Sequence, residues 1–388
     1  MTERTATSVS DRRQVRAEPP LRVCLVGPSL DIVGGQSIVL DRLLSRFRET
    51  EGVTVSFVPV NPRLPGPLRA LQRVKYLRTV VTSIAYVASL LRRLRHVDVV
   101  HAFSASYWSY LLAPVPAMLV GRLYGKTVVL NYHSGEADDH LANWRTAIPL
   151  ARLAHVIAVP SGYLVEVFKR HALGARAVFN FVEVDAIPVR ARSTVRPRFL
   201  SNRNLEALYN VACTIRAFAR VQQVHPDAEL VVAGDGRERG ALEALVGELG
   251  LRNVRFLGRV APSAMPALYD AADVYLNSPD IDNMPSSIIE AYAAGLPVVT
   301  TDAGGIPFIV RHDVTGLMVP TGDDAAMATQ ALRLLADPAL VTRLTARARE
   351  ECLERYVWRA VRDAWLQLYR EAMATAAHGA PSAQAGAA

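Results

Sequence analysis

The chain has 388 residues, 51% of them hydrophobic and 21% charged, which is ordinary for a globular protein of two or three domains. Its three cysteines, Cys24, Cys213 and Cys352, are far apart and form neither a CxxC motif nor a Cys/His cluster. This spacing argues against a disulfide framework and against a zinc site, and it favours a reducing cytosol.

Charge is distributed unevenly along the chain. Residues 1–197 carry 26 Lys+Arg against 14 Asp+Glu, whereas residues 198–388 carry 18 against 22. The basic first half indicates either a solvated basic surface or contact with an anionic partner, such as a membrane surface or a phosphorylated acceptor. The basic residues form no compact run interleaved with aromatic residues, which argues against a nucleic-acid partner.

Both ends of the chain are polar or rich in small residues. Residues 1–20 contain no apolar segment of the kind found in signal peptides, so we expect no signal peptide and a disordered tail. Residues 374–388 are expected to form a second disordered tail. We therefore expect a cytoplasmic protein, with peripheral contact at the inner face of the membrane left open.

Short apolar runs of strand length alternate with longer helical patterns through the first half. The predicted strands are 21–27, 53–60, 98–103, 127–133, 155–161 and 175–182. Such nearly continuous apolar runs are typical of a parallel sheet that is buried on both faces. The sequence therefore predicts a doubly wound, Rossmann-like α/β domain over residues 21–196.

The same pattern starts again in the second half. Strands are predicted at 228–234, 254–258, 273–278, 296–301 and 315–320, and the boundary between the two domains is placed in VRPRF, at 195–199. The second doubly wound domain is expected to span residues 197–354. A final helix is predicted at 354–373, with an apolar side formed by Tyr356, Val357, Ala360, Ala364, Leu366 and Leu368.

Two apolar segments bear on the membrane question. Residues 79–91 are flanked by Arg78 and by Arg92 and Arg93, and residues 103–120 are interrupted by prolines. The first segment is shorter than the roughly 20 residues that a membrane-spanning helix needs. Both are more typical of core or interface helices, although association of 79–91 with one membrane surface stays open.

Two glycine-rich turns follow predicted strands. In GPSLDIVGGQS, Gly34 and Gly35 would let backbone amides at a helix start approach an anion or a sugar. In VVAGDGRERG, Gly234 and Gly236 follow a strand in a similar way, but without the spacing of a dinucleotide fingerprint. Each motif alone is a weak signal, because many such turns are glycine-rich for packing.

The run DNMPSSIIEAYAAGLPVVTTDAGGIP, at 282–307, is more informative. Asp282 falls in a loop after a predicted strand, and Met284 and Pro285 lead into a helix that is expected to begin at about Ser286 or Ser287. The amides of such a helix start can hold a diphosphate, and Glu290, one turn later, can accept hydrogen bonds from a ribose diol. The alternative is a capped helix that carries a solvated glutamate.

The whole run resembles the signature of the retaining GT-B fold glycosyltransferases of family 4, the glycosyl transferase group 1. The shared pattern is two acidic residues eight apart, then EAxAxGxPVV and GGxP. Other segments fall in the family's order, namely GGQS, DVVH at 98–101, NYH at 131–133, Asn180 in FNFVEVD, FLGR and ADVYLNSP. The resemblance extends from about residue 21 to about residue 372.

The resemblance implies a transferase that moves a sugar from a nucleotide-diphosphate sugar to a sugar, glycolipid or lipid-linked acceptor, with retention of configuration. It assigns the donor to the second domain and the acceptor to the first, and it places helix 355–373 back on the first domain. It implies that Glu290 binds the ribose, that Asp282 contacts the donor sugar and that His133 lies near the reacting sugar. The backbone at Met284 to Ser287 would hold phosphate and sugar, with Gly34 and Gly35 approaching from the other domain. No metal or other cofactor is expected.

The chain departs from the family pattern at three positions. Asp282 stands where the family most often has Glu, Leu208 where a Lys commonly follows Arg203 by five residues, and Phe308 where a Glu usually follows GGIP. The missing cation could be replaced by Asn202, by Asn204 or by an arginine from elsewhere. Arg259 could contact base or phosphate, and Gly234 the donor, or Arg259 could be a solvated loop residue.

Two other functions share this architecture. One is a nucleotide-sugar epimerase or a phosphorylase, which the run at 282–307 disfavours. The other is a donor-binding or scaffold protein without catalysis, for which Leu208 and Phe308 are the only support.

Overall fold

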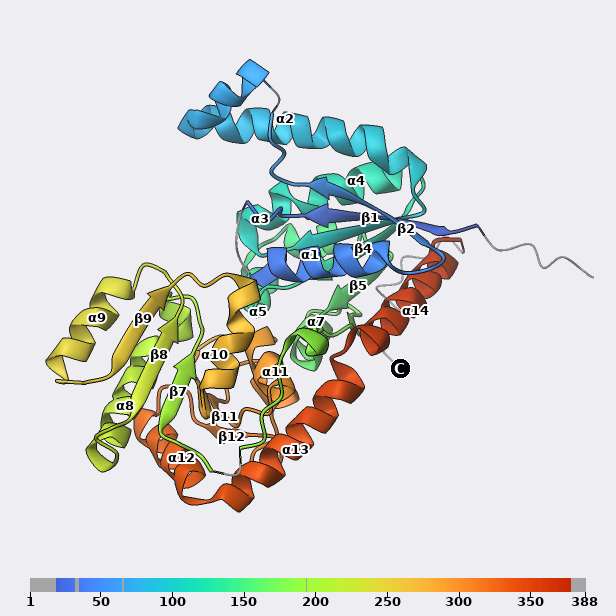
Figure 1. Ribbon diagram of the computed structural model, residues 1–388. Coiled ribbons are helices and arrows are strands. Elements are labelled where there is room, and N and C mark those ends of the chain that lie inside the picture. Colours follow the sequence, from blue (N-terminus) through green and yellow to red (C-terminus); the bar gives the residue numbers. More distant parts are fainter. Residues whose placement is uncertain (1–18, 32–34, 65, 193, 378–388) are drawn as a thin grey trace, which may run out of the picture.

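The computed structural model describes residues 19–31, 35–64, 66–192 and 194–377 of the chain, arranged as two α/β domains (Figure 1). The first domain contains a six-stranded parallel sheet of order β2-β1-β3-β4-β5-β6. Its strands are β1 (Leu21–Gly27), β2 (Val53–Pro59), β3 (Val99–Ser104), β4 (Thr127–Tyr132), β5 (Val156–Val159) and β6 (Arg176–Ala177).

Neighbouring residues of β1 point to opposite faces of the first sheet, as the period of a strand requires. Val23 and Leu25 pack with α1 (Gly35–Arg48) and α14 (Trp358–Ala377). Cys24 and Val26 pack with α2 (Lys75–Arg93) and α4 (Pro114–Leu123). The remaining helices are η1 (Gly66–Arg73), η2 (Leu94–His96), α3 (Tyr107–Leu112), α5 (Ala137–Asn143), α6 (Ala147–Ala151), α7 (Gly162–Arg170) and η3 (Val184–Ala186).

The second domain contains another six-stranded parallel sheet, of order β12-β11-β10-β7-β8-β9. Its strands are β7 (Arg198–Ser201), β8 (Glu229–Ala233), β9 (Val254–Gly258), β10 (Val274–Asn277), β11 (Val298–Thr301) and β12 (Leu317–Val319). Its helices are η4 (Ala207–Tyr209), α8 (Val211–Val224), α9 (Arg239–Glu248), η5 (Pro262–Ala264), α10 (Met265–Ala271), α11 (Ser286–Ala293), η6 (Ile306–Phe308), α12 (Asp324–Ala336) and α13 (Pro338–Arg355).

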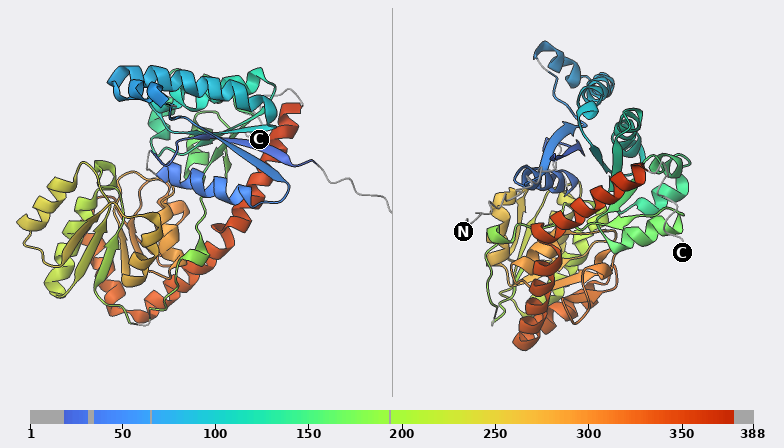
Figure 2. Two further views of the ribbon diagram at one scale, coloured as in Figure 1. Left: turned by 45° about the horizontal axis from the view of Figure 1, so that its top comes forward. Right: turned by 90° about the vertical axis from the view of Figure 1, so that its right-hand side faces the viewer.

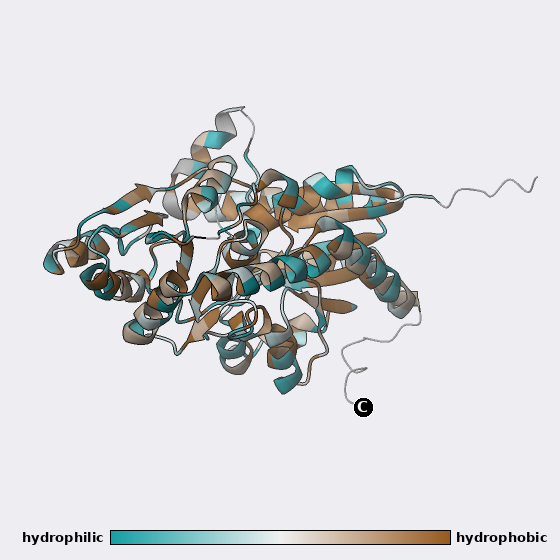
Figure 3. Ribbon diagram, turned by 60° about the horizontal axis from the view of Figure 1, so that its bottom comes forward, coloured by the Kyte–Doolittle hydropathy of each residue, from teal (hydrophilic) through white to brown (hydrophobic). Residues whose placement is uncertain are grey.

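Both sheets are buried between helices, and their strands are the most hydrophobic part of the ribbon (Figure 3). Every residue of β3 and of β4 is buried. This agrees with the short apolar runs of the sequence, because a parallel sheet covered on both faces has no solvated side. The prediction of two doubly wound α/β domains is confirmed.

Two details of the strand prediction were wrong. Strand β7 was not predicted, although it lies between β10 and β8 in the second sheet. Its four residues begin with Arg198, so the run is too short and too polar at one end to stand out. Conversely, only Arg176 and Ala177 of the predicted strand 175–182 pair in the sheet.

The segment after β6 leaves the first domain earlier than the sequence suggested. Val182 and Ile187 belong to the core of the second domain. The buried guanidinium of Arg192 donates to the carbonyls of Ala272 and Ala294, at 3.0 and 2.8 Å for the closest pairs. These carbonyls end α10 and α11, so a cation there also complements the two helix dipoles.

The C-terminal helical region consists of two helices, α13 and α14, rather than one helix starting at residue 354. The helical conformation is interrupted between them, at Tyr356 and Val357. Helix α14 lies along the first domain in all views (Figures 1 and 2). Its buried side consists of Val361, Trp365, Leu368, Tyr369 and Ala372. Of the predicted apolar side only Leu368 is among these residues, whereas Ala364 and Leu366 are partly buried against the same core.

A buried polar contact ties α14 to the first sheet. The Nδ1 atom of His101, in β3, lies 2.7 Å from the hydroxyl of Tyr369, and the amide of Asn131 lies 2.9 Å from its Nε2. Burial lowers the pKa of His101 to about 3, so the imidazole is neutral at pH 7. His101 therefore has a structural role here.

Candidate functional site

The candidate site lies at the carboxyl edge of the second sheet, where parallel α/β sheets bind their ligands. Arg203 follows β7, and Asp282 lies in the loop between β10 and α11. The Nη2 atom of Arg203 donates to Oδ2 of Asp282 at 2.5 Å, and the two side chains are only 12% and 11% exposed. The structure therefore brings together the predicted phosphate-binding cation and the predicted sugar-binding carboxylate.

The environment of Asp282 opposes its ionisation. Burial raises the pKa of Asp282 above its usual range, although the Arg203 guanidinium and the Asn283 amide both act to lower it. The guanidinium of Arg203 also stacks over the ring of Tyr209, with 4.2 Å between its central carbon and the ring centre. A carboxylate with a raised pKa beside a fixed cation is typical of a functional site rather than of a solvated loop.

Glu290 lies one turn into α11 and has a partner on each carboxylate oxygen. Its Oε1 accepts from Nη2 of Arg42 at 2.8 Å, and its Oε2 accepts from the Tyr269 hydroxyl at 2.8 Å. Asn202, one of the predicted site residues, donates to the same Tyr269 hydroxyl at 2.6 Å. Because Arg42 belongs to α1 of the first domain, this network joins the two domains at the candidate site.

Helix α11 begins at Ser286, as predicted, but no serine caps it. Pro285 occupies the N-cap position, and no side chain accepts a hydrogen bond there. The hydroxyl of Ser287 instead accepts from Arg203 at 3.3 Å. The first-turn amides and the positive end of the helix dipole thus lie beside the Arg203–Asp282 pair, where an anion would be stabilised.

The loop that carries Asp282 rests directly on the GGIP turn. The amide of Gly305 donates to the Asp282 carbonyl at 3.0 Å. A Cβ atom at Gly305 would clash with the Asn283 carbonyl, and one at Gly304, where φ is +51°, would clash with the Asp282 carbonyl. The two glycines are needed because another backbone approaches them closely.

Gly234 and Gly236 serve a similar packing function. A Cβ atom at Gly234 would clash with the carbonyl of Arg203, and one at Gly236 with that of Leu205. The resemblance of this turn to a dinucleotide fingerprint is therefore misleading, because the missing Cβ atoms face protein backbone. Gly234 positions Arg203 within the candidate site.

His133 directly follows β4, at the carboxyl edge of the first sheet, and Gly135, two residues later, lies against Ile281 and Asp282 of the site loop. The ring of His133 stacks on Phe103 with 5.4 Å between centres, and Phe103 stacks on His101 at 4.9 Å. Burial lowers the pKa of His133 to about 4, so its imidazole is neutral at pH 7 and acts as a hydrogen-bonding group rather than a cation.

Further contacts hold the two domains together around the Asp282 loop. The hydroxyl of Ser161 donates to the side-chain carbonyl of Asn283. The side-chain amide of Asn180 donates to the Met284 carbonyl at 3.4 Å. Each of these residues except Ser161 lies in a motif that the sequence analysis named, but their pairing across the domains could not be predicted from it.

Several predicted residues stand apart from this cluster. Arg259 is exposed and makes no contact with it among the described residues. Gly34 lies outside the described residues, and Gly35 begins α1, with open space around its missing Cβ atom. The side chain of Leu208 is exposed, and its carbonyl accepts from the Asp280 amide at 2.9 Å, so this position orders the site loop.

Phe308, which stands where the resembled family usually has Glu, packs against the first domain. A Cβ atom at Gly162 would lie 2.6 Å from its ring, and the ring of Tyr163 lies 6.5 Å away. Helix α7 starts at Gly162. The substitution therefore exchanges a charged side chain for an apolar contact between domains.

Arg42 and Tyr269 belong to the cluster but were not predicted as site residues. Arg42 lies 248 residues from its partner Glu290 in the chain, and nothing in its local sequence distinguishes it from the other arginines of α1. Two buried atoms of the cluster, Asn202 Oδ1 and Arg203 Nε, have no hydrogen-bond partner among the described residues. Buried polar atoms without a partner are uncommon in folded proteins and are ordinarily satisfied by a water, an ion or a ligand.

The described residues contain no group of three or more His, Cys, Asp or Glu side chains that could hold a metal ion. None of the described helices is long and apolar enough to span a bilayer.

The part of the chain that contains the candidate site matches a known family of proteins. Residues 187–351, which include β7 to most of α13, match the family "Glycosyl transferases group 1". The chain is 34% identical over 161 residues to the lipopolysaccharide core biosynthesis glycosyltransferase LpsD of Rhizobium meliloti, covering 41% of this chain and 45% of LpsD. It is 31% identical over 217 residues to the phosphatidyl-myo-inositol mannosyltransferase of Mycobacterium leprae, covering 54% and 57%. Both alignments thus cover less than two thirds of the relative.

The whole architecture is similar to that of solved structures. The crystal structure of Anabaena Alr3699/HepE in complex with UDP matches with a TM-score of 0.73, at 18% sequence identity, over 90% of this chain and all of that one. Sucrose-phosphate synthase from Thermosynechococcus elongatus matches with a TM-score of 0.72, at 21% identity, over 91% and 99%. The fold is therefore the GT-B fold, with two Rossmann-like domains that face each other.

The packing of the GGIP turn leads to a test of how the site loop is held. We expect Gly305→Ala to lower the free energy of unfolding by roughly 1 to 3 kcal/mol, as overpacking does, because the methyl group must displace the Asn283 backbone. Gly240→Ala is the matched control, since open space surrounds that glycine in α9. Urea unfolding of both variants measures the effect. Equal stability of the two variants would contradict the role given to Gly305.

Proposed function

We propose that this chain is a glycosyltransferase that moves a sugar from a nucleotide-diphosphate sugar to an acceptor. The observation that carries the proposal is the cluster of Asp282, Glu290 and Arg203 around the start of α11. These are the groups that such a donor requires, namely acceptors for hydroxyl groups beside a cation and a helix dipole for phosphates. The family match over residues 187–351 covers the whole cluster.

Each part of the donor has a suitable partner in the cluster. In the proposed complex Glu290 binds the ribose diol, Arg203 and the first amides of α11 bind the diphosphate, and Asp282 faces the sugar. Charge that develops on the leaving diphosphate is then stabilised by a preorganised cation and a helix dipole. UDP is the first nucleotide to test, because Alr3699/HepE was crystallised with it.

The finer features of the reaction are also proposals. We infer that the configuration at the sugar is retained, with the acceptor attacking from the face that the diphosphate leaves and the diphosphate taking the acceptor's proton. His133 lies on the first domain, where we place the acceptor. The names of LpsD and of the phosphatidyl-myo-inositol mannosyltransferase support a glycolipid or other glycoconjugate as the acceptor. We propose that no metal is needed, so that activity survives chelation by EDTA.

Two alternatives are less well supported. A scaffold that has lost catalysis would explain Leu208 and Phe308, but both side chains have structural surroundings in this chain, and Asp282, Glu290 and Arg203 are all in place. An epimerase or a phosphorylase of the same fold has no feature here that favours it over a transferase.

Isothermal titration calorimetry with UDP, GDP, ADP and their sugars, without metal, tests the proposed donor site. We expect one nucleotide to bind selectively. We also expect Glu290→Gln and Arg203→Lys each to weaken its binding about tenfold, since each variant alters a hydrogen bond to a charged group. Glu248→Ala, an exposed carboxylate of α9, is the control. Failure of every nucleotide to bind would remove the proposal.

The ion pair between Arg42 and Glu290 must also be reconciled with donor binding. Both oxygens of Glu290 already accept from protein donors. Each oxygen keeps a second lone pair, but the side chain is only 12% exposed, so we infer that a ribose binds there by displacing one of the two donors. Arg42 is the group that can leave most easily, because its side chain is 23% exposed whereas Tyr269 is buried. The Arg42–Glu290 pair therefore competes with the nucleotide for Glu290.

A double-mutant cycle tests this competition. We expect Arg42→Ala to tighten nucleotide binding by about fivefold, equivalent to about 1 kcal/mol for a partly exposed ion pair. In the Glu290→Gln background the same substitution should change the affinity little. Arg48→Ala, an exposed arginine on the same helix, should have no effect in either background. Weaker binding by Arg42→Ala would show that Arg42 contacts the nucleotide instead.

A further inference from the structure

Helix α2 has apolar side chains on two opposite faces. Tyr86 and Leu90 are buried in the first domain. The outer face carries four exposed apolar side chains, Leu77 (38% exposed), Val80 (55%), Ile84 (65%) and Leu91 (40%). With 3.6 residues per turn these four positions fall within a stripe about 60° wide. The outer side of a helix that covers a core is ordinarily polar, so this stripe requires another explanation.

The apolar surface extends beyond α2 at both ends. Leu71 and Val74, which precede the helix, are 36% and 56% exposed. On α4, Leu119 is 50% and Leu123 is 73% exposed. The hydroxyl of Tyr124, directly after α4, donates to the Leu91 carbonyl at 3.0 Å, so the ends of the two helices lie together. We call this set of eight exposed residues the α2 face.

The segment that contains η1, α2 and η2 carries charges of one sign, although Asp31 from the loop after β1 pairs with its Arg63. No Asp or Glu occurs between Glu51 and Asp98, whereas the same 46 residues contain eight Lys and Arg, at 63, 69, 73, 75, 78, 92, 93 and 95. On the helix, Arg92 falls about 60° from the edge of the apolar stripe and Arg78 about 100° from it. The face is therefore complementary to a partner that offers an apolar layer to the exposed Leu, Ile and Val side chains and anionic groups to the arginines around them.

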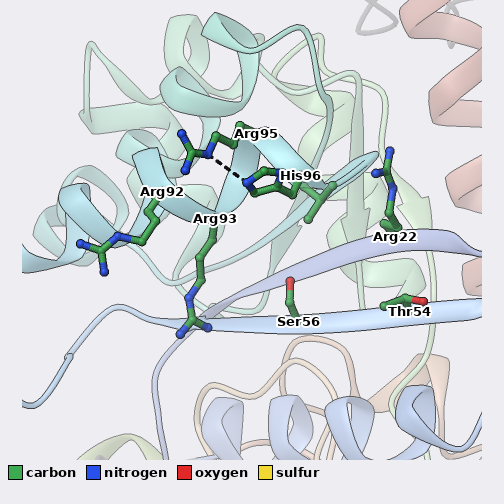
Figure 4. Close-up of a pocket in the computed structure, with 8 residues that line it drawn as sticks. Arg22, Thr54, Ser56, Arg92, Arg93, Arg95 and His96 are labelled. Carbon is green, nitrogen blue, oxygen red and sulfur yellow. Dashed lines mark hydrogen bonds between the residues drawn. The ribbon is translucent and has the colours of Figure 1, made fainter.

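The carboxyl end of α2 opens into a cavity of about 430 Å³ that is lined by arginines (Figure 4). Arg93 donates to the Phe57 carbonyl at 2.8 Å and Arg95 to the His96 ring at 2.9 Å. Arg22, on the far side, is neutralised by Asp98 at 2.6 Å. In the part of the chain that the structure describes, no carboxylate pairs with Arg92, Arg93 or Arg95, so their charges are free to attract phosphate groups.

We propose that the α2 face docks on an anionic phospholipid bilayer. The apolar stripe enters the boundary between headgroups and acyl chains, and Arg92 and Arg95 contact lipid phosphates, as in a helix that lies in the membrane interface. A second copy of this chain fits the face less well, because a twofold interface would bring the same arginines against each other.

The topology orients the docked protein. Helix η1 and the start of α2 follow β2, so they lie toward the carboxyl edge of the first sheet, the edge at which His133 follows β4. The arginine cavity lies at the opposite edge, beside Arg22 and Thr54 at the starts of β1 and β2. A bilayer along the α2 face would therefore run past the end of the domain where we place the acceptor. The docking itself does not depend on the proposed transferase activity.

Vesicle flotation of the full chain tests the proposal. We expect the protein to float with phosphatidylcholine vesicles that contain about one quarter phosphatidylglycerol, and not with phosphatidylcholine alone. Binding should fall at about 0.5 M salt, where charge attraction is screened. Ile84→Glu should reduce binding about tenfold, as expected when an inserted apolar side chain becomes charged. Its control is Leu249→Glu, an exposed apolar residue of the second domain.

Two double charge-reversal variants distinguish attraction by these particular arginines from an effect of the net charge of the protein. Arg92→Glu with Arg95→Glu should abolish flotation, whereas Arg255→Glu with Arg359→Glu, two exposed residues elsewhere, should not. Unchanged circular dichroism and thermal melting show that the variants fold. The proposal is overturned if the wild type does not float, or if the control and α2 variants bind equally. It is also overturned if Ile84→Glu dissolves a dimer of a protein that binds no vesicles.

Discussion

The candidate site depends on one buried ion pair, between Arg203 and Asp282. Burying two charges is unfavourable unless both are well paired and hydrogen-bonded. Here Asp282 accepts from the guanidinium and from the Asn283 amide, and Arg203 has Ser287 and the Tyr209 ring as further partners. Three glycines, at 234, 304 and 305, then allow the surrounding backbone to approach closely enough to hold both residues.

The second carboxylate of the site, Glu290, also pairs with an arginine, and this ion pair joins the two domains. Glu290 is fixed by Tyr269 from its own domain and by Arg42 from the other. In this structure the site residues therefore pair with one another, Asp282 with Arg203 and Glu290 with Arg42. A nucleotide sugar that replaces these contacts would free Arg42 and thereby loosen one of the links between the domains. In the proposed binding mode, donor binding and the relative position of the domains would be coupled through the Arg42–Glu290 ion pair.

Much of this could be predicted from local sequence patterns. The apolar strands, the helix that starts at Ser286 and the run from Asp282 to Pro307 are each encoded within a few neighbouring residues. The features that could not be predicted depend on contacts between distant parts of the chain. Arg42 has no local signal for its partner Glu290, β7 is too short to recognise, and the buried side of α14 depends on how that helix meets the first sheet.

Hydrogen–deuterium exchange with and without saturating UDP, or the nucleotide that calorimetry selects, tests the central claim most directly. If the donor binds where we place it, amides of residues 282–290 and 304–306 will exchange more slowly in the complex, because the ligand orders the loop and the start of α11. Protection of residues 92–97 instead would show that the nucleotide's phosphates bind the arginine cavity of the first domain. That result would contradict the assignment of the donor site to the second domain.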